Sequence, residues 1–430
     1  MKFSLLSRFL TCLLALCLVA CTPADPQNAL GSDPRRSETV TLLGTLTGKG
    51  IEDIQAVVAP FSDRSGIAVD YQGTDAFTTL LPLQVAAGNP PDLALFPQPG
   101  LLKDLVTENA LIPLESLVDE QTLANALTEQ WRSLGKIGEQ TYGLPLRVYL
   151  KGLVWYLPQR FEEKGYEVPQ TWEALENLTQ RMIAEGETPW CLGLESGEAT
   201  GWVGTDWVED ILLRQAGAET YDRWLNHEIP FTDPAVEQAF QTFGTIALDN
   251  QAVLGGKVGV LSISFADAPL GLFRDPPGCY LHNQSNFISA FFPTQTNLEE
   301  VDVFRLPSFT TTADPSPIVV GAVQLGVLRD TPTVRSFLAY LLTPEPQRIW
   351  AGLGGHLSPY REVEISAYPD RLSQKEAKIL KSAQTVKFDA SDAMPSAVGT
   401  GSFWAGIVDY LSGVNLKTVL QEIDASWPHP

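Results

Sequence analysis

Long apolar runs are rare in this 430-residue sequence. Beyond its first segment, no stretch approaches the roughly 18 uninterrupted apolar residues that a membrane-spanning helix needs. We therefore expect the folded part of the chain to be soluble, and to be held at a membrane only by an attached lipid.

Positive charge is scarce as well. The chain has 29 Lys and Arg residues against 51 Asp and Glu residues, and its formal net charge is -22. A surface this acidic repels the phosphates of nucleic acids and of anionic lipids. We therefore expect no nucleic-acid partner.

Catalytic and metal-binding patterns are mostly missing. The four histidines show no zinc-like spacing, and HExxH, GxSxG and a complete P-loop are absent. Ser133-Leu134-Gly135-Lys136 matches the SxxK of penicillin-recognising enzymes, but the companion SDN and KTG elements are lacking, which favours a chance match. We expect no metal, no cofactor and no catalysis.

The N-terminus has the pattern of a targeting segment. Lys2 and Arg8 precede an apolar run that is too short to span a bilayer, which predicts a signal peptide over residues 1–20. Leu18-Val19-Ala20-Cys21 resembles the lipobox of bacterial lipoproteins, in which Cys21 receives the lipid; the alternative is an ordinary signal peptide with a chance cysteine. Residues 21–38 are rich in proline and polar residues, which predicts a flexible linker.

Cysteine is limited to five residues. Cys12 and Cys17 would leave with the signal peptide and Cys21 would carry the lipid. In an oxidising compartment the remaining pair, Cys191 and Cys279, is predicted to form a disulfide. Two buried free thiols are the alternative.

The order of apolar segments predicts an α/β fold. Short apolar runs at Val40–Leu43, Ile67–Tyr71 and Leu93–Phe96 read as strands, and an amphipathic helix between Ile51 and Phe61 separates the first two. This βαβαβ beginning indicates mainly parallel sheets. The length after removal of the signal peptide exceeds what one hydrophobic core usually organises, so we expect two domains.

Further helices carry start and stop signals. Thr232-Asp233-Pro234 and Thr331–Thr333 each place a capping side chain beside a proline. A further helix should start at Thr343-Pro344 and stop at the glycines of 352–355. Apolar stripes over 403–411 and 416–423 predict that two packed helices close the chain.

The segment from Gly201 to Asp210 combines tryptophan with hydrogen-bonding side chains. A pyranose ring presents an apolar face that lies flat on an indole, and hydroxyls that suit carboxylates and amides. This pattern favours a carbohydrate ligand. We also expect Thr205 or Asp206 to cap a helix at this point. Core packing is the alternative for Trp202 and Trp207.

Several motifs together resemble one family, the family 1 extracellular solute-binding proteins of carbohydrate ABC importers. They are Ala87–Gly100, Tyr142–Pro145, Pro189–Cys191, Gly201–Asp210, Gly354–Pro359 and Met394–Trp404. Within the family, Trp190-Cys191, Gly278–Tyr280 and His282–Gln284 are similar to binding proteins for α-glucosides and compatible solutes such as glucosylglycerol, trehalose or sucrose. The chain departs from the family at His282-Asn283, where two histidines are common.

The resemblance implies an α/β, two-lobed periplasmic-binding-protein fold of type II, similar to maltose-binding proteins, with the ligand cleft between the lobes. We expect lobe one at 39–148 and 324–366, and lobe two at 149–323 and 367–430. The implied function is capture of a small carbohydrate by lobe closure and its delivery to an ABC permease. A monomer, lipid-anchored in the periplasm, suits that role.

Ligand contacts are expected from loops that follow strands and face the cleft. The candidates of lobe one are Thr47, Gly48, Asp75, Gln98, Gly354 and Gly355. Two more, Arg147 and Lys151, lie near the first strand that crosses between the lobes. The candidates of lobe two are Trp202, Asp206, Trp207, Glu209, His282 and Trp404. Each has a structural alternative: Asp75 as a turn residue, Arg147 and Lys151 as partners of structural carboxylates, and Trp404 in a core stripe.

Two other functions stay open at this point. A lipoprotein enzyme of the glycosidase type would also hold sugar in an aromatic cleft before cleaving it. Carboxylate pairs do not separate this function from binding, because 51 acidic residues place many pairs within reach of one another. The chain could also be a receptor for a non-sugar solute, such as a polyamine or an amino acid derivative. An acidic cleft with aromatic side chains would bind such a cation equally well.

Overall fold

The first sheet is built from the N-terminal strands and one long strand from late in the chain. The computed structural model describes residues 39–309 and 317–428. The strand order is β2-β1-β3-β10-β11, with β6 also paired to β10. The strands are β1 (Thr39–Gly44), β2 (Ala68–Gly73), β3 (Leu93–Phe96), β6 (Leu144–Leu150), β10 (Ile318–Val327) and β11 (Val386–Phe388). The three N-terminal strands are parallel, so the expected βαβαβ beginning is confirmed.

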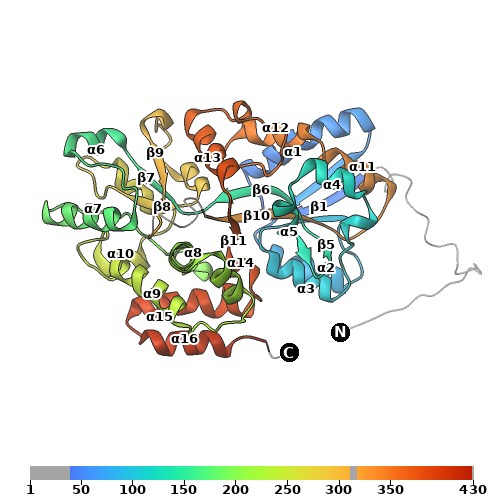
Figure 1. Cartoon of the computed structure of the whole chain (residues 1–430). Helices are drawn as coiled ribbons and strands as arrows, with labels where there is room; N and C mark the ends of the chain where they lie inside the picture. Colours follow the sequence, from blue (N-terminus) through green and yellow to red (C-terminus); the bar gives the residue numbers. More distant parts are fainter. Residues whose placement is uncertain (1–38, 310–316, 429–430) are drawn as a thin grey trace, which may run out of the picture.

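Helices cover both faces of this sheet (Figure 1). On one face, Phe61 packs against Phe337 with ring centroids 5.0 Å apart. On the other face, Phe77 meets Phe96 edge to face at 5.6 Å. The helices of this part are α1 (Lys49–Ser65), α2 (Phe77–Ala86), α3 (Pro99–Thr107), α4 (Glu120–Ala126), α5 (Glu129–Ser133), α11 (Pro332–Leu341) and α12 (Pro344–Leu353). A short hairpin, β4 (Lys136–Ile137) and β5 (Gln140–Thr141), follows α5.

The second sheet has the order β8-β7-β9 and is antiparallel. Its strands are β7 (Leu153–Tyr156), β8 (His282–Gln284) and β9 (Asp302–Arg305). The expectation of mainly parallel sheets is therefore wrong here, because both partners of β7 return toward it from the opposite direction. Apolar strand patterns do not encode strand direction.

Helices pack around the second sheet and build the second core. They are α6 (Pro158–Lys164), α7 (Trp172–Ala184), α8 (Trp202–Leu225), α9 (Pro234–Ala247), α10 (Gly256–Ser262), α15 (Trp404–Ser412) and α16 (Leu416–Ala425). The last two pack closely: a Cβ placed on Gly406 would lie 2.8 Å from Ile423. The expected closing pair of helices is confirmed.

β6 and β10 run between the two lobes, as Figure 1 shows. They pair antiparallel, and β11 adds to β10 in parallel. Along the chain, α13 (Arg371–Ser382) precedes β11 and α14 (Ala390–Ala393) follows it. We call β6, β10 and β11 the crossing strands. The residue bounds of the two lobes stay a prediction.

The helix signals read from the sequence are confirmed. The Thr331 side chain accepts a hydrogen bond from the backbone N–H of Val334 at 3.2 Å and caps α11. α12 ends at Leu353, and Gly354 and Gly355 follow with φ of 77° and 76°. Glycine adopts such positive φ values without the steric cost that other residues bear.

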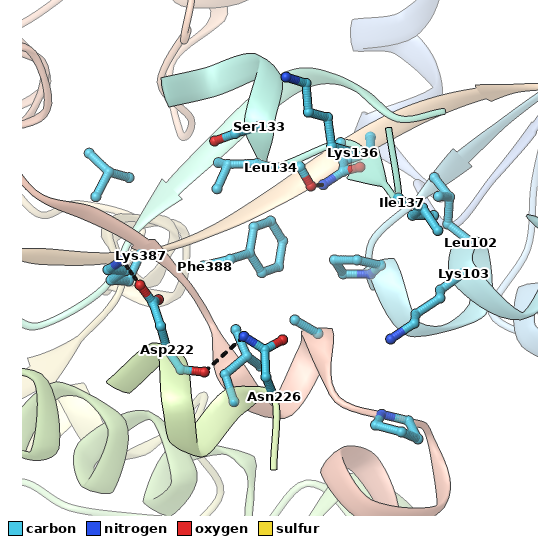
Figure 2. A pocket seen from close by; sticks show the side chains of 18 of the residues that line it. Leu102, Lys103, Ser133, Leu134, Lys136, Ile137, Asp222, Asn226, Lys387 and Phe388 are labelled. Atoms are coloured by element: carbon cyan, nitrogen blue, oxygen red, sulfur yellow. Dashed lines mark hydrogen bonds and ion pairs between the residues drawn. The ribbon is translucent and has the colours of Figure 1, made fainter. Parts of the chain in front are cut away.

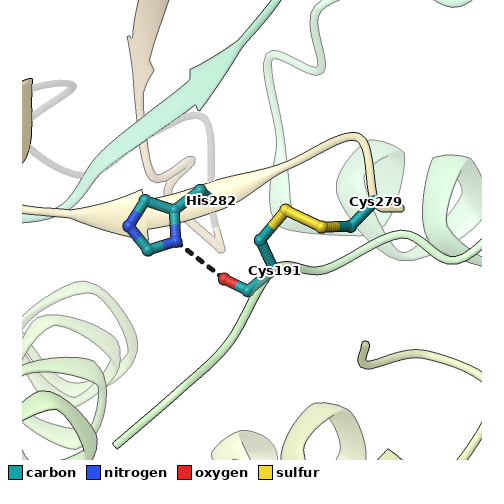
Figure 3. The surroundings of a disulfide bond; sticks show 3 residues. All are labelled: Cys191, Cys279 and His282. Carbon is teal, nitrogen blue, oxygen red and sulfur yellow. Dashed lines mark hydrogen bonds between the residues drawn. A yellow bond between two sulfur atoms is a disulfide. The ribbon is translucent and has the colours of Figure 1, made fainter. Parts of the chain in front are cut away.

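A disulfide joins Cys191 to Cys279, with the two Cα atoms 5.4 Å apart (Figure 3). It ties the segment after α7 to the segment that leads into β8. The predicted pairing is confirmed. The predicted signal peptide, lipidated Cys21 and linker lie outside the described residues; within the described ranges, no helix is long and apolar enough to cross a membrane.

Candidate functional site

The crossing strand β6 presents three polar or aromatic side chains on one face. Side chains alternate along a strand, so Arg147, Tyr149 and Lys151, just beyond its end, point the same way. A Cβ on Gly321 of β10 would lie 3.5 Å from the Lys151 side chain and 3.8 Å from that of Tyr149. That glycine leaves room for both side chains.

Aromatic side chains of the second lobe gather beside this face. Tyr149 meets Phe287 at 5.8 Å, and Phe287 lies 6.0 Å from Trp202. Trp202 meets Phe265 at 5.2 Å, and Phe265 meets Phe291 at 5.3 Å. All five are partly exposed. We call them the aromatic wall; such a surface can bind the apolar face of a ring-shaped ligand.

Lys151 is the charged centre beside the wall. Its Nζ donates to both carboxylate oxygens of Asp206 at 2.8 Å and lies 2.8 Å from an oxygen of Asp389. The same ammonium lies 5.3 Å from the centre of the Trp202 ring. A cation over an indole is attracted to the ring face, so Lys151 fixes the position of Trp202.

The electrostatics of this cluster follow from burial and from the shared ammonium. Burial opposes the charged form of Lys151, but Asp206 and Asp389 outweigh it and raise the pKa of the amine well above its usual value. Burial raises the pKa of Asp206. Burial acts the same way on Asp389, yet Lys151 and hydrogen bonds from its neighbours outweigh it and keep the pKa of Asp389 below its usual value. The Lys151 ammonium therefore keeps Asp389 ionised and is shared with the carboxyl group of Asp206.

Glu209 has a structural position in this arrangement. Its carboxylate is fully buried and accepts hydrogen bonds from the backbone N–H groups of Ala390 and Ser391 at 2.7 and 3.0 Å. It also accepts from the Tyr221 hydroxyl at 3.2 Å. These contacts hold the start of α14 in place. Both carboxylate oxygens of Glu209 already accept hydrogen bonds within the protein. The ligand contact expected for Glu209 stays a prediction.

Trp207 lies in the core of the second lobe. It is 1% exposed and meets Trp190 edge to face at 5.1 Å. The core-packing alternative fits Trp207, while Trp202 stays partly exposed on the wall.

The expected helix cap at Thr205 or Asp206 is wrong. α8 begins at Trp202, with Gly201 as its N-cap residue, so both lie inside the helix. Gly201 has φ of 120°, and a Cβ there would lie 2.3 Å from the backbone oxygen of Trp404. Only glycine meets both conditions, and it brings Trp404 close to the start of α8.

Arg147 lies toward the first lobe. It is 7% exposed, and its Nη2 lies 3.1 Å from Nδ1 of His356. The guanidinium also lies 5.8 Å from the rings of Tyr149 and Trp350. Burial and the charge of Arg147 lower the pKa of His356 well below its usual value, so this ring is neutral. The expected carboxylate partner is present for Lys151; among the described residues, Arg147 has none within ion-pair distance.

The candidates of the first lobe sit at the carboxyl ends of its parallel strands and after α12. Thr47 and Gly48 form the exposed loop between β1 and α1, and Asp75 is exposed after β2. Gln98 follows β3, is half-buried and hydrogen-bonds to Asp392 of the second lobe. Gly354 and Gly355 follow α12. Of this set, the described contacts bring Gln98 to the Lys151 cluster through Asp392.

His282 and Trp404 lie on the second lobe. The Nδ1–H of His282 donates to the backbone oxygen of Cys191 at 2.7 Å, beside the disulfide (Figure 3). Its ring is 2% exposed. Trp404 is half-buried at the start of α15. Ligand contacts by these two residues stay predictions.

Stability should depend on the buried ring of His282. Burial lowers its pKa from the ordinary 6.5 to about 4. The unfolded chain therefore takes up a proton as the pH falls through 6.5, whereas the folded protein does not until about pH 4. Stability is full above pH 6.5 and falls below it by about 1.4 kcal/mol per pH unit.

Urea denaturation at pH 7 and pH 5 measures this effect in wild type and in His282→Gln. The wild type should lose about 2 kcal/mol more than the variant between the two pH values. Equal losses in both proteins would show that His282 does not carry the pH dependence.

Sequence reasoning missed six residues of this arrangement. Tyr149 could have been found from the alternation with Arg147 and Lys151 on one strand. The others, Asp389, Asp392, Phe265, Phe287 and Phe291, come from segments that no local pattern marks. Within the described residues, no group of three or more His, Cys, Asp or Glu side chains is arranged to hold a metal ion.

The sequence matches a known family over most of its length. A family model described as "Bacterial extracellular solute-binding protein" matches residues 47–348. The chain belongs to this family. The predicted membership is thereby confirmed, and the family is one of binding proteins that work outside the cytoplasm.

Relatives of this solute-binding protein extend over nearly the whole chain. The "Osmoprotective compounds-binding protein GgtB" of Synechocystis sp. is 46% identical over 96% of this chain and 98% of the relative. The "Alpha-glucosides-binding periplasmic protein AglE" of Rhizobium meliloti is 40% identical over 91% of this chain and 87% of the relative.

The fold class is also confirmed. The solved bacterial solute receptor AcbH, whose structure is described with an exclusive preference for β-D-galactopyranose, has a TM-score of 0.75 at 19% identity. It covers 90% of this chain and 98% of its own. At that identity the likeness concerns the fold alone.

Proposed function

We propose that this solute-binding protein captures a small α-glucoside or a glucoside-type compatible solute and delivers it to an ABC permease. The observation that carries the proposal is the aromatic wall, in which Trp202 is fixed by Lys151 beside the crossing strands. Aromatic faces bind the C–H faces of sugar rings, and the polar residues nearby supply partners for hydroxyls. The named ligands of the two relatives, osmoprotective compounds and α-glucosides, support this ligand class.

Closure of the lobes would signal to the permease that a ligand is bound. A ligand that contacts the wall and residues of the first lobe, such as Gln98 and Arg147, is bound more tightly when the lobes close around it. We propose that the protein acts as a monomer, tethered through lipid on Cys21, so that the closed form can dock on the permease. Binding rather than catalysis fits the donor set, since the buried carboxylates are held by Lys151 and by backbone N–H groups.

A ligand panel tests the proposal. Glucosylglycerol, sucrose, trehalose, maltose, galactose and spermidine are each added to the purified protein, while tryptophan fluorescence and thermal unfolding are followed. At 100 times Kd an α-glucoside should stabilise the folded state by about 2.7 kcal/mol, and mass spectrometry should recover it unchanged. A response to spermidine alone would overturn the sugar assignment, and hydrolysed sugar would point to a glycosidase.

A further inference from the structure

A cavity lies between segments of the two lobes (Figure 2), and none of its lining residues belongs to the aromatic wall. Its volume is about 580 Å³. The first lobe contributes α3 and the Ser133–Gly138 segment, and the second contributes the end of α8, β11 and Trp427. The cavity therefore changes shape whenever the lobes move relative to each other.

The cavity and the wall lie on opposite faces of the crossing strands. Phe388 of β11 lines the cavity and pairs in register with Val320 of β10. The next residue of β10, Gly321, faces the side chains of Tyr149 and Lys151. Neighbouring residues of a strand point to opposite faces, so the Phe388 side chain lies behind the wall. Gln324, three residues after Gly321 on β10, also lines the cavity and donates a hydrogen bond to the backbone oxygen of Leu134 at 3.0 Å. Figure 2 shows the Phe388 ring projecting into the space between the lobes.

The charge of the cavity differs from that of the whole chain. Three lysines line it: Lys103 and Lys136 from the first lobe and Lys387 from the second. Asp222 is the one carboxylate of the described lining, and it already pairs with Lys387 at 2.5 Å. This excess of cations occurs in a protein with a net charge of -22.

Lys103 is the lysine of the cavity whose ammonium has no carboxylate within ion-pair distance in the described ranges. Lys136 pairs with Glu129 at 2.6 Å. The lysine of the SxxK match is therefore part of an ordinary surface ion pair. Lys103 makes no ion pair with any residue in the described ranges, and in Figure 2 it extends from α3 toward Phe388 and Asn226. Lysine ammonium groups are effective partners for phosphate and carboxylate groups.

We propose that this cavity binds a small anion bearing a phosphate or carboxylate group, and that the bound anion strengthens solute binding at the aromatic wall. The claim that the anion strengthens solute binding rests on the proposed function. When the lobes swing apart on the wall side, the far side of the crossing strands narrows. An anion in the cavity resists that narrowing, so it favours the closed form and lowers the Kd of the solute.

The experiment first measures anion binding without sugar. Sodium phosphate and sodium succinate are titrated separately into the protein, with ionic strength held constant by NaCl, and the melting temperature is followed. We expect at least one anion to raise Tm in wild type and in Lys257→Gln, which removes an exposed lysine of α10 outside the cavity. Lys103→Gln should abolish the rise. Equal rises in Lys103→Gln, or none in wild type, would overturn the anion site.

The second arm measures coupling by calorimetry. The Kd of the best-binding α-glucoside of the panel should fall three- to ten-fold in the presence of the active anion, in wild type and Lys257→Gln but not in Lys103→Gln. An anion-dependent Tm rise with an unchanged sugar Kd would overturn the coupling. Because the first arm uses no sugar, absence of any sugar binding counts against the proposed function and leaves the anion site to be decided by Tm.

Discussion

Trp202→Ala should raise the Kd for the bound glucoside about 100-fold, which corresponds to a loss of about 3 kcal/mol. The indole is held between Phe265 and Phe287, with the Lys151 ammonium 5.3 Å from its centre. Alanine removes the ring that would stack on the sugar and leaves the wall with a gap at its middle. Isothermal titration calorimetry with the best ligand of the panel measures the change.

Trp202→Phe is the matched variant, since it keeps an aromatic face at the same position. It should retain much of the affinity, with a Kd between those of wild type and Trp202→Ala. Thermal unfolding without ligand separates binding from folding. A Trp202→Ala protein that binds the sugar as tightly as wild type would remove the wall from the binding site.

Lys151→Met should lower the free energy of unfolding by about 3–5 kcal/mol. The lysine is 8% exposed and is the cation that both Asp206 and Asp389 contact. Methionine has a similar volume but leaves two buried carboxylates without their ammonium partner. Urea denaturation at pH 7 measures the loss, and sugar affinity should fall as well because Trp202 loses its cation.

Two further variants separate burial of charge from simple loss of a lysine. Lys151→Met combined with Asp206→Asn should recover part of the stability, since the Asp206 carboxylate is one of the two left unpaired. Lys164→Met, which breaks an exposed pair with Glu187, should change stability little. A single Lys151→Met variant as stable as Lys164→Met would contradict the assigned role of the buried cluster.

Local patterns in the sequence were sufficient for elements whose signals lie within a few residues. The strands at Leu93–Phe96 and Val40–Leu43, the cap at Thr331 and the glycine stop after α12 are set by side-chain periodicity and by backbone restrictions. The disulfide followed from counting, because only two cysteines remained to pair. Family membership followed from motifs spread over most of the chain.

Strand direction and burial were decided by the tertiary structure. Trp202 and Trp207 stand five residues apart in one segment, yet one lies on the wall and the other in the core. The difference arises because α8 begins at Gly201 and turns Trp207 toward Trp190, and no pattern within the segment shows which face of the helix meets the second sheet.

The sequence by itself determined the family, the α/β elements and the pair of cysteines that form the disulfide. The tertiary structure alone decided which residues surround Lys151, because Asp206 and Asp389 are 183 positions apart and meet only when α8 packs beside the crossing strands. It also decided that a cation-lined cavity lies behind the aromatic wall. Contacts between distant segments depend on how whole layers pack, and that information is not present in any local pattern of residues.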